Sequence, residues 1–347
     1  MDIQILLDKM HPVYTNQDQV SGHVILRNEA ELDIATITIK LSGSATSRLD
    51  SGKLTESHEL FTRSEQILPP GNCAGLFTSR AVTIPPGEHS FPFSIMFPQV
   101  SECYKSNTTD ATRKRPSSHE PHHLLRKLPP SAGNRRTPEE ISYVLEASIV
   151  QDGLIRRTHA TRDISIHPVS TIRQPFHTLK ARTSVTCNTT ASGRLSPPLI
   201  YDIEAELVNG PFLLLGHPIA LATLLLETTE VRACGSMQSF TRPWVIQTMT
   251  NLRRPLVAGR GPTVGSVLNL DGSLWSRHRV PLHLTPTFET CNISRNYKLE
   301  VRLGIDFGQN NTRIVELHFP AYVLSPSLRR SDVRSQPAEK ELKLEFA

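Results

Sequence analysis

The chain has 347 residues, of which 38% are hydrophobic and 20% are charged. This is the composition of a globular protein long enough for two domains, each with its own core. Its 26 prolines favour short strands and turns over long helices. No apolar run reaches the roughly 18 residues that a membrane-spanning helix needs. The N-terminus lacks the basic stretch and small-residue cleavage site of a secretory signal, so we expect a cytoplasmic protein.

The first half of the sequence predicts a succession of strands. Residues 3–7 form a short apolar run, and residues 20–26 alternate between apolar and polar side chains. Residues 34–41 are rich in β-branched side chains and should bury Ile37, Ile39 and Leu41 on one face. Gly43 interrupts this alternation, and a β-bulge there would let the strand continue to residue 46.

Residues 84–98 combine strand alternation with four prolines. Phe91, Phe93, Ile95 and Phe97 occupy alternate positions, which is typical of a strand with one buried face. Pro92 lies inside the run and has no N–H for a sheet ladder. We therefore predict an edge strand that begins after the turn at residues 85–87 and buries its aromatic face.

Residues 101–138 are polar, basic and rich in proline and serine, so we expect a disordered insertion there. Residues 141–149 then alternate cleanly, Asp152-Gly153 predicts a hairpin turn, and residues 155–166 return as the partner strand. The first domain is expected to span residues 1–168.

The second half repeats this pattern over residues 169–326 and ends in a polar segment, 327–347, which we expect to be a flexible tail. Residues 219–226 have helical leucine spacing, but the flanking glycine, proline and threonines favour a strand. The fold class predicted by these elements is all-β, with two β-sandwich domains. Further strands are expected at 199–208, 212–215, 244–248, 280–284, 297–305 and 314–323.

The net charge of +5 comes largely from one segment of the first half. The plain interpretation is a solvated loop. The alternative is a contact surface for phosphate groups or an anionic membrane. We expect no nucleic-acid partner. The candidate contact residues are Arg113, Lys114, Arg115, Arg126, Lys127, Arg135 and Arg136.

No residue pattern predicts catalysis. The sequence contains no GxGxxG, GxxxxGK[ST], HExxH or GxSxG motif. His122 and His123 have no second ligand pair at a metal-like interval, and Glu204 and Glu206 are best interpreted as a solvated strand face. Neither a disulfide framework nor a zinc site is indicated by the five scattered cysteines. We therefore expect no catalytic residue, no metal and no cofactor. The cysteines are Cys73, Cys103, Cys187, Cys234 and Cys291.

Three segments together resemble the arrestin family, and fungal α-arrestins in particular. They are residues 20–26, residues 34–45 and the block IPPGEHSFPF that starts at Ile84. This resemblance implies two tandem immunoglobulin-like β-sandwiches. It also implies a non-enzymatic adaptor that binds cytoplasmic segments of transporters or receptors during endocytosis, protein sorting or ubiquitin-dependent trafficking, at the plasma membrane or endosomes.

α-Arrestins recruit a HECT-type ubiquitin ligase through PPxY motifs, and this sequence departs from that pattern. Pro197-Pro-Leu-Ile-Tyr201 has one residue too many before the tyrosine, which shifts the tyrosine out of register in a WW-domain groove. The alternative is therefore an arrestin-folded subunit of a sorting complex without ligase recruitment. A third hypothesis, from another class, is a hydrolase or metal enzyme on a β-sandwich. For the buried charges implied by the family, Arg162, Asp163 and Asp306 are candidates, although a simple strand-end ion pair is preferred.

Overall fold

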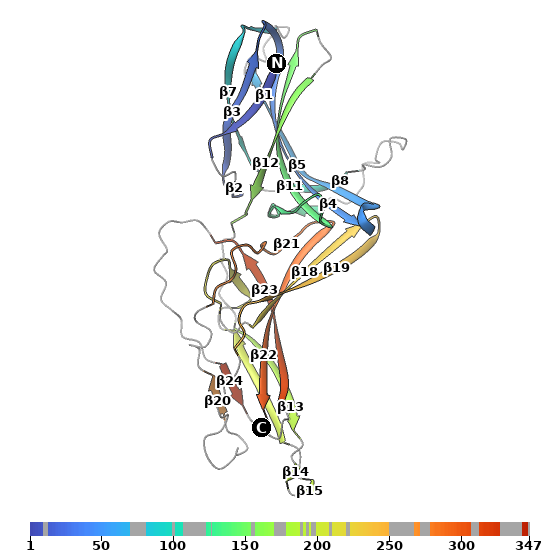
Figure 1. Cartoon of the computed structure of the whole chain (residues 1–347), viewed down its shortest axis with the longest axis vertical. Helices are drawn as coiled ribbons and strands as arrows, with labels where there is room; N and C mark the ends of the chain where they lie inside the picture. Colours follow the sequence, from blue (N-terminus) through green and yellow to red (C-terminus); the bar gives the residue numbers. More distant parts are fainter. Residues whose placement is uncertain are drawn as a thin grey trace. The chain divides into compact units, whose positions relative to one another are not determined.

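The computed structural model divides into two compact units. The first contains Met1–Val169, Glu230–Ser239 and Phe288–Ser294, and the second contains the remaining residues. Nearly all regular structure in both units is β-strand, which confirms the all-β prediction of two sandwich-like groups of sheets (Figure 1). The structure describes residues 1–9, 13–69, 81–98, 101–106, 123–125, 127–153, 157–169, 178–187, 190–191, 194–195, 199–207, 210–219, 223–249, 267–270, 278–306, 312–326 and 342–345.

The first unit contains a three-stranded sheet and a larger sheet. The small sheet has the order β1 (Asp2–Leu7), β3 (Gln19–Asn28) and β7 (Gly87–Met96). The short helix η1 (Asp50–Gly52) joins β4 (Leu32–Leu49) to β5 (Leu54–Leu68). The larger sheet has the order β2 (Val13–Tyr14), β12 (Arg157–Ile166), β11 (Glu139–Gln151), β4 (Leu32–Leu49), β5 (Leu54–Leu68), β8 (Ser101–Ser106) and β9 (His123–Leu125), with β6 (Val82–Ile84) on β4 and β10 (Ala132–Gly133) on β11.

Strand β4 shows how the alternation of side chains builds this core. Ile37, Ile39 and Leu41 are fully buried, as predicted from their spacing. The register with β5 shifts between Gly43 and Ser44, so the strand continues past an irregularity at this point, as predicted. The extra residue is Leu60 of β5, however, and the alternation of β4 itself is not interrupted at Gly43 but runs on to Leu49. A Cβ at Gly43 would lie 2.7 Å from the ring of Tyr143. Glycine is therefore required at this point because the tyrosine ring packs directly on the backbone.

Strand β7 confirms the interpretation of the proline-rich block. Phe93, Ile95 and Phe97 are buried in the core of the first unit, and Phe91 packs against it. In the described part of the chain β7 pairs with β3 alone, so Pro92 lies in an edge strand. The missing N–H is tolerated there because an edge strand has one unpaired side.

The expected insertion at 101–138 is only partly irregular. Residues 107–122 lie outside the described residues, but β8, β9 and β10 all fall within the segment. Leu128 and Ala132 are buried in the core, and the Tyr143 hydroxyl donates a hydrogen bond of 2.7 Å to the Pro129 carbonyl. The prediction of disorder is therefore wrong for residues 127–138. It followed from the basic composition of the segment, but the apolar residues Leu128 and Ala132 pack in the core.

The second unit also contains two principal sheets, and β18, β19 and β22 contribute residues to both units. One has the order β13 (Leu179–Cys187), β16 (Leu199–Leu207), β24 (Leu342–Glu345) and β20 (Val267–Leu270). The other has the order β17 (Phe212–Leu214), β23 (Thr312–Leu324), β22 (Ile293–Asp306), β18 (Leu224–Ala233) and β19 (Ser236–Val245), with β21 (Phe288–Glu289) on β22. A separate hairpin joins β14 (Thr190–Ala191) and β15 (Arg194–Leu195).

Three sequence predictions for the second half need correction. β24 lies inside the expected flexible tail and pairs with both β16 and β20. The strand expected at 219–226 begins only at Leu224 among the described residues. Residues 280–284 form no strand but a turn, held by a hydrogen bond from the Leu284 N–H to the Pro281 carbonyl. No helix in the described part of the chain is long and apolar enough to cross a membrane.

Candidate functional site

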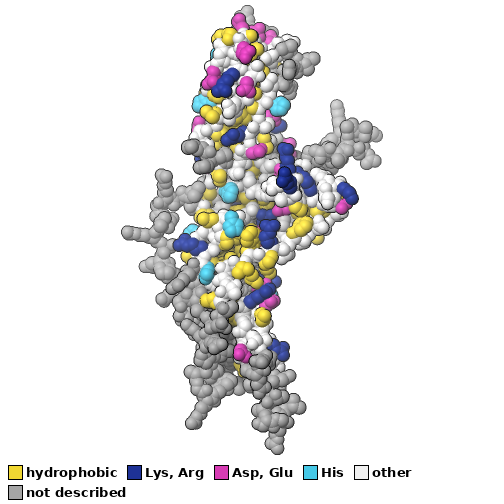
Figure 2. All heavy atoms as spheres, viewed as in Figure 1, with side chains coloured by type: hydrophobic (Ala, Val, Ile, Leu, Met, Phe, Trp, Pro, Cys, Tyr) yellow, Lys and Arg dark blue, Asp and Glu magenta, His cyan; other side chains and the backbone are white. Residues whose placement is uncertain are grey.

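The structure describes three of the seven basic residues singled out in the sequence. Arg135 and Arg136 are exposed in the turn after β10, and burial lowers the pKa of the Lys127 ammonium group. Arg113, Lys114, Arg115 and Arg126 lie outside the described residues. In the view of Figure 2, Lys and Arg side chains are interspersed with Asp and Glu rather than gathered into one basic surface. The anionic-surface contact therefore stays a prediction.

The carboxylate pair of β16 forms cross-strand ion pairs. Lys180 Nζ lies 2.9 Å from Glu204 Oε1 and 3.7 Å from Glu206 Oε2. The hydrogen bond from Lys180 to Glu204, and then the charge of Glu204, raise the pKa of the lysine. The lysine side chain is 59% exposed, so this is a solvated surface pair with little effect on stability. The two carboxylates serve as partners of one lysine, which favours the solvated-face interpretation over acid–base chemistry.

The other predicted candidates are also at the surface. Arg162 and Asp163 are exposed on β12, and Asp306 is exposed at the end of β22. His89 shares a hydrogen bond of 2.7 Å with the Pro85 carbonyl. Among the described residues, no group of three or more His, Cys, Asp or Glu side chains is arranged to hold a metal ion.

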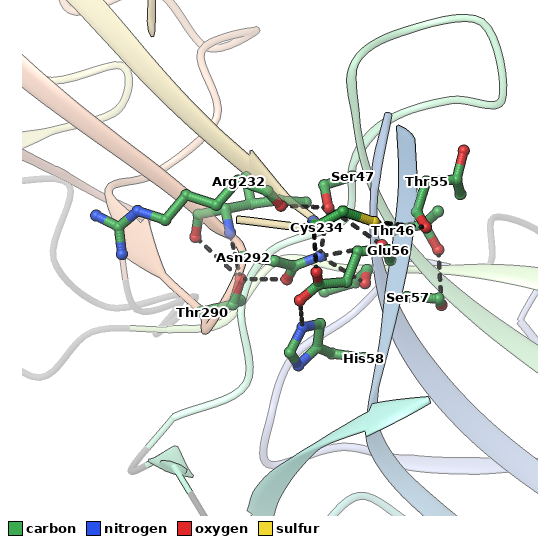
Figure 3. A network of polar contacts seen from close by, with 12 residues as sticks. Thr46, Ser47, Thr55, Glu56, Ser57, His58, Arg232, Cys234, Thr290 and Asn292 are labelled. Carbon is green, nitrogen blue, oxygen red and sulfur yellow. Dashed lines mark hydrogen bonds and ion pairs between the residues drawn. The ribbon is translucent and has the colours of Figure 1, made fainter. Parts of the chain in front are cut away.

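A polar network lies in the first unit and was not recognised in the sequence (Figure 3). It joins the end of the β4–β5 hairpin to the hairpin formed by Glu230–Ser239 and to the segment around Asn292. We call it the hairpin network, and its members are Ser47, Glu56, His58, Arg232, Cys234, Thr290 and Asn292. The turn of the 230–239 hairpin consists of Cys234 and Gly235, both with positive φ (50° and 81°), as a two-residue turn of type I′ requires.

Asn292 is at the centre of the hairpin network. Its Nδ2 donates hydrogen bonds of 3.0 Å to the Ala45 carbonyl and 3.1 Å to Ser47 Oγ. Ser47 in turn donates a 2.6 Å hydrogen bond to the Arg232 carbonyl. Ser47 and Asn292 are almost completely buried. Because buried polar groups are costly when unpaired, these bonds fix the position of the hairpin on β4.

Glu56 makes the second connection to the hairpin. Its Oε1 lies 2.7 Å from His58 Nε2, and its Oε2 accepts a hydrogen bond of 2.7 Å from the Cys234 N–H. The Nδ1 atom of His58 is buried with no hydrogen-bond partner among the described residues, so its ring is held through Nε2. The carboxylate binds the backbone of Cys234 and not its thiol. The arrangement therefore orders the hairpin turn and does not activate the cysteine as a nucleophile.

A buried ion pair occupies the second unit. Glu227 on β18 and Arg295 on β22 are 8% and 7% exposed at their side chains, and Arg295 Nε lies 3.3 Å from Glu227 Oε1. Arg295 Nε also donates a 3.0 Å hydrogen bond to Thr229 Oγ1. Burial, and next the charge of Glu227, raise the pKa of the nearby Tyr297 hydroxyl. Glu227 and Arg295 are thus buried charges that no sequence pattern predicted.

The ion pair also positions an aromatic residue at the end of β19. Trp244 Nε1 donates a hydrogen bond of 2.8 Å to Glu227 Oε2. The Arg242 guanidinium carbon lies 5.7 Å from the centre of the Trp244 ring, and the His283 ring lies 5.1 Å from it on centroids. This stack is a cation–π arrangement. Arg242 and Trp244 thus form an ordered, partly exposed surface on an edge strand.

Comparison with known proteins finds a family match in the first third of the chain. Residues 3–108 match the family model "Arrestin (or S-antigen), N-terminal domain", which supports the arrestin family for this chain. With the two sandwich-like units, it is consistent with the arrestin fold of two tandem domains. No curated protein matches the sequence.

A search of solved structures returns the crystal structure of Spo0M, a sporulation control protein from Bacillus subtilis. The two chains are 17% identical over 47% of this chain and 48% of Spo0M, with a TM-score of 0.27. The match thus spans about half of each chain.

Proposed function

We propose that this protein is a non-enzymatic arrestin-like adaptor that binds cytoplasmic segments of membrane proteins during endocytosis or protein sorting. The observation that carries this proposal is the match of residues 3–108 to arrestin N-terminal domains. The two sandwich-like units support it, because each offers sheet faces and strand edges to extended segments of a partner. The fungal α-arrestin subtype, suggested by residues 20–26, 34–45 and 84–93, belongs to the proposal. So does a location in the cytoplasm, at the plasma membrane or at endosomes.

Recruitment of a HECT-type ubiquitin ligase is the part of the proposal that the sequence supports least. The segment Pro197-Pro-Leu-Ile-Tyr201 holds the tyrosine one position beyond the PPxY register. If a ligase joins the assembly, we expect the bound membrane protein or another adaptor to provide the contact.

Affinity purification of the tagged chain from solubilised membranes tests the adaptor function. We expect transporters or receptors to be recovered with the chain and to be absent when the tag alone is used. Recovery of a stable complex of soluble subunits would instead favour the sorting-complex alternative. If neither class of partner is enriched over the tag, the adaptor proposal is wrong.

The anionic-surface contact needs a separate test on vesicles. Deleting the basic segment, residues 101–138, would remove Leu128 and Ala132 from the core. Substitution of its basic residues is therefore the better design. We expect the combined change Arg113→Gln, Lys114→Gln and Arg115→Gln to reduce co-sedimentation with phosphatidylserine vesicles, because each lost charge near such a surface weakens binding by about 1 kcal/mol.

The matched control removes three exposed charges elsewhere on the chain. Lys53, Lys298 and Arg313 are exposed in strands or turns outside the segment, and changing them to glutamine lowers the net charge equally. Equal losses in the two variants would show that only the net charge matters. Undiminished binding of the segment variant would contradict the proposed contact.

A further inference from the structure

Strand β19 differs from three other edge strands of the described chain. β13 ends its sheet with Lys180 and Arg182 in ion pairs, and β17 has three residues. β7 contains Pro92 and buries one face. By contrast, β19 has ten residues, nine of them exposed, and Arg242 is its one charged residue. The edges of sheets are normally protected by charge, shortness or cover, so β19 is more open to another strand than β7, β13 or β17.

The pairing of β19 with β18 follows from the two-residue turn between them. Cys234 and Gly235 form the turn, so Ala233 lies opposite Ser236. At the far end, the Ile246 N–H donates a 3.0 Å hydrogen bond to the Thr223 carbonyl. Thr223 and Ile246 lie equally far from the turn, so this pair has the same register as Ala233 and Ser236. The register is therefore continuous along the hairpin, and it places Glu227 opposite Arg242.

This register decides which backbone groups of β19 have no partner strand in the described part of the chain. In a two-residue hairpin the residues next to the turn bond to each other, and every second residue thereafter points its N–H and C=O toward the partner strand. Phe240, Arg242 and Trp244 therefore bond toward β18, while Thr241 and Val245 direct their backbone groups outward. Pro243 also occupies an outward position, where its missing N–H costs no bond with β18.

The side chains beside this edge give it a chemical preference. Phe240, Arg242 and Trp244 share one face of the strand, since side chains alternate. Phe240 is 39% exposed, and Arg242 is stacked on Trp244, which Glu227 fixes by a 2.8 Å hydrogen bond. The charge of Glu227 is opposed by Arg295 at 3.3 Å. The surface thus presents an ordered guanidinium group beside an exposed phenyl ring.

We propose that the 240–245 edge of β19 binds an extended segment of a partner protein as an additional strand. An unpaired ladder of N–H and C=O groups is satisfied by another extended backbone, which identifies the class of ligand. Opposite charges and apolar pairs across neighbouring strands stabilise the pairing. The segment therefore carries an acidic residue opposite Arg242 and an apolar residue opposite Phe240. This inference rests on the proposed adaptor function and assigns it a site in the second unit.

The direct test measures binding of the full chain to a fluorescein-labelled ten-residue peptide that alternates valine and threonine around one central glutamate. Thr241→Pro removes an outward N–H and leaves the bonds to β18 in place. We expect it to weaken binding by about tenfold, which corresponds to the loss of about 1.4 kcal/mol. Thr241→Val is the control, because it keeps the N–H and should bind like the wild type. Unfolding curves of both variants check that the second unit remains folded.

The charge preference is tested by reversing the charge of residue 242 and, separately, the charge at the centre of the peptide. Arg242→Glu should weaken binding of the glutamate peptide by about tenfold and strengthen binding of the same peptide with lysine at the centre. Equal affinity of Arg242→Glu for both peptides would overturn the assignment. Self-association of the chain that Thr241→Pro abolishes would also overturn it, because the edge would then bind a second copy.

Failure of the β19 site can be distinguished from failure of the proposed adaptor function. If the Thr241→Pro chain still recovers the same membrane proteins in affinity purification, the adaptor function stands and the β19 site is wrong. If the wild-type chain recovers no membrane protein but binds the peptide through β19, the site stands and the adaptor function is wrong.

Discussion

The hairpin network of the first unit and the Glu227–Arg295 pair of the second unit both bury polar groups among strands, but by different means. The hairpin network relies mainly on amide, hydroxyl and carbonyl groups, and the hydrogen bonds of Ser47 and Asn292 to Arg232, Ala45 and each other are 2.6 to 3.1 Å long. The ion pair holds two full charges at 3.3 Å with side chains less than a tenth exposed. A buried neutral group costs less to remove from water than a buried charge, which depends on its partner ion for stability.

This difference predicts how strongly a single substitution destabilises each unit. In the first unit, the loss of one hydrogen bond leaves the other connections of the hairpin in place. In the second unit, the loss of either ion leaves an uncompensated charge in the sheet. The second unit should therefore respond more strongly to a single substitution, and the following variants test that order.

The largest effect is expected for Arg295→Met. This change leaves the Glu227 carboxylate buried without its cation, which typically costs about 3–5 kcal/mol of unfolding free energy. Urea unfolding followed by Trp244 fluorescence measures it. The double variant Glu227→Gln with Arg295→Met removes both charges and should recover much of the loss. If the single and double variants are equally unstable, charge is not the reason for the destabilisation.

A smaller effect is expected for Glu56→Ala, which removes the acceptor of the Cys234 N–H and the partner of His58. Hydrogen bonds to charged groups contribute about 1.5–3 kcal/mol. The free energy of unfolding should fall within that range, and hydrogen exchange at the Cys234 amide should accelerate. Unchanged exchange at this amide would show that the hairpin turn is held by other contacts.

A similar or somewhat smaller loss is expected for Asn292→Ala. Ser47 and the Ala45 carbonyl would each lose a buried donor, at a cost of about 1–3 kcal/mol. Asn296→Ala is the matched control, because Asn296 is exposed on β22, the strand that begins directly after Asn292. A loss at Asn292 no greater than at Asn296 would mean that the hairpin network does not contribute to stability.

The smallest effect is expected at Asn296 itself. A surface substitution away from caps, turns and buried partners usually changes the unfolding free energy by less than about 0.5 kcal/mol. Thermal unfolding of Asn296→Ala should superimpose on that of the wild type. A clear shift would indicate a contact of β22 that these hydrogen bonds do not include.

Much of the strand arrangement was predictable because it follows from local patterns of side-chain alternation and turn residues. Ile37, Ile39 and Leu41 are buried as their spacing of two indicates. Pro92 lies in an edge strand, and β11 and β12 pair antiparallel on either side of Asp152-Gly153. Each of these inferences needs only neighbouring residues and the geometry of a single strand or turn.

The sequence failed where a residue's surroundings come from distant parts of the chain. Ser47 and Arg232 are 185 residues apart, and Ser47 and Asn292 are 245 apart, yet they form the hairpin network. Leu128 is buried although it lies in a basic, proline-rich segment. No local pattern distinguishes a serine or an asparagine that will be buried from one that will be solvated.

The sequence by itself thus determined the strand class, the buried faces of β4 and β7 and the turn at Asp152-Gly153, because side-chain alternation and turn chemistry act over a few residues. Only the tertiary structure decided which polar groups are buried together. It also showed that β19, which overlaps the strand predicted at 244–248 only at Trp244 and Val245, is a long and nearly uncharged edge. Its openness depends on which strand lies beside it and which face is covered, and both follow from contacts between distant segments.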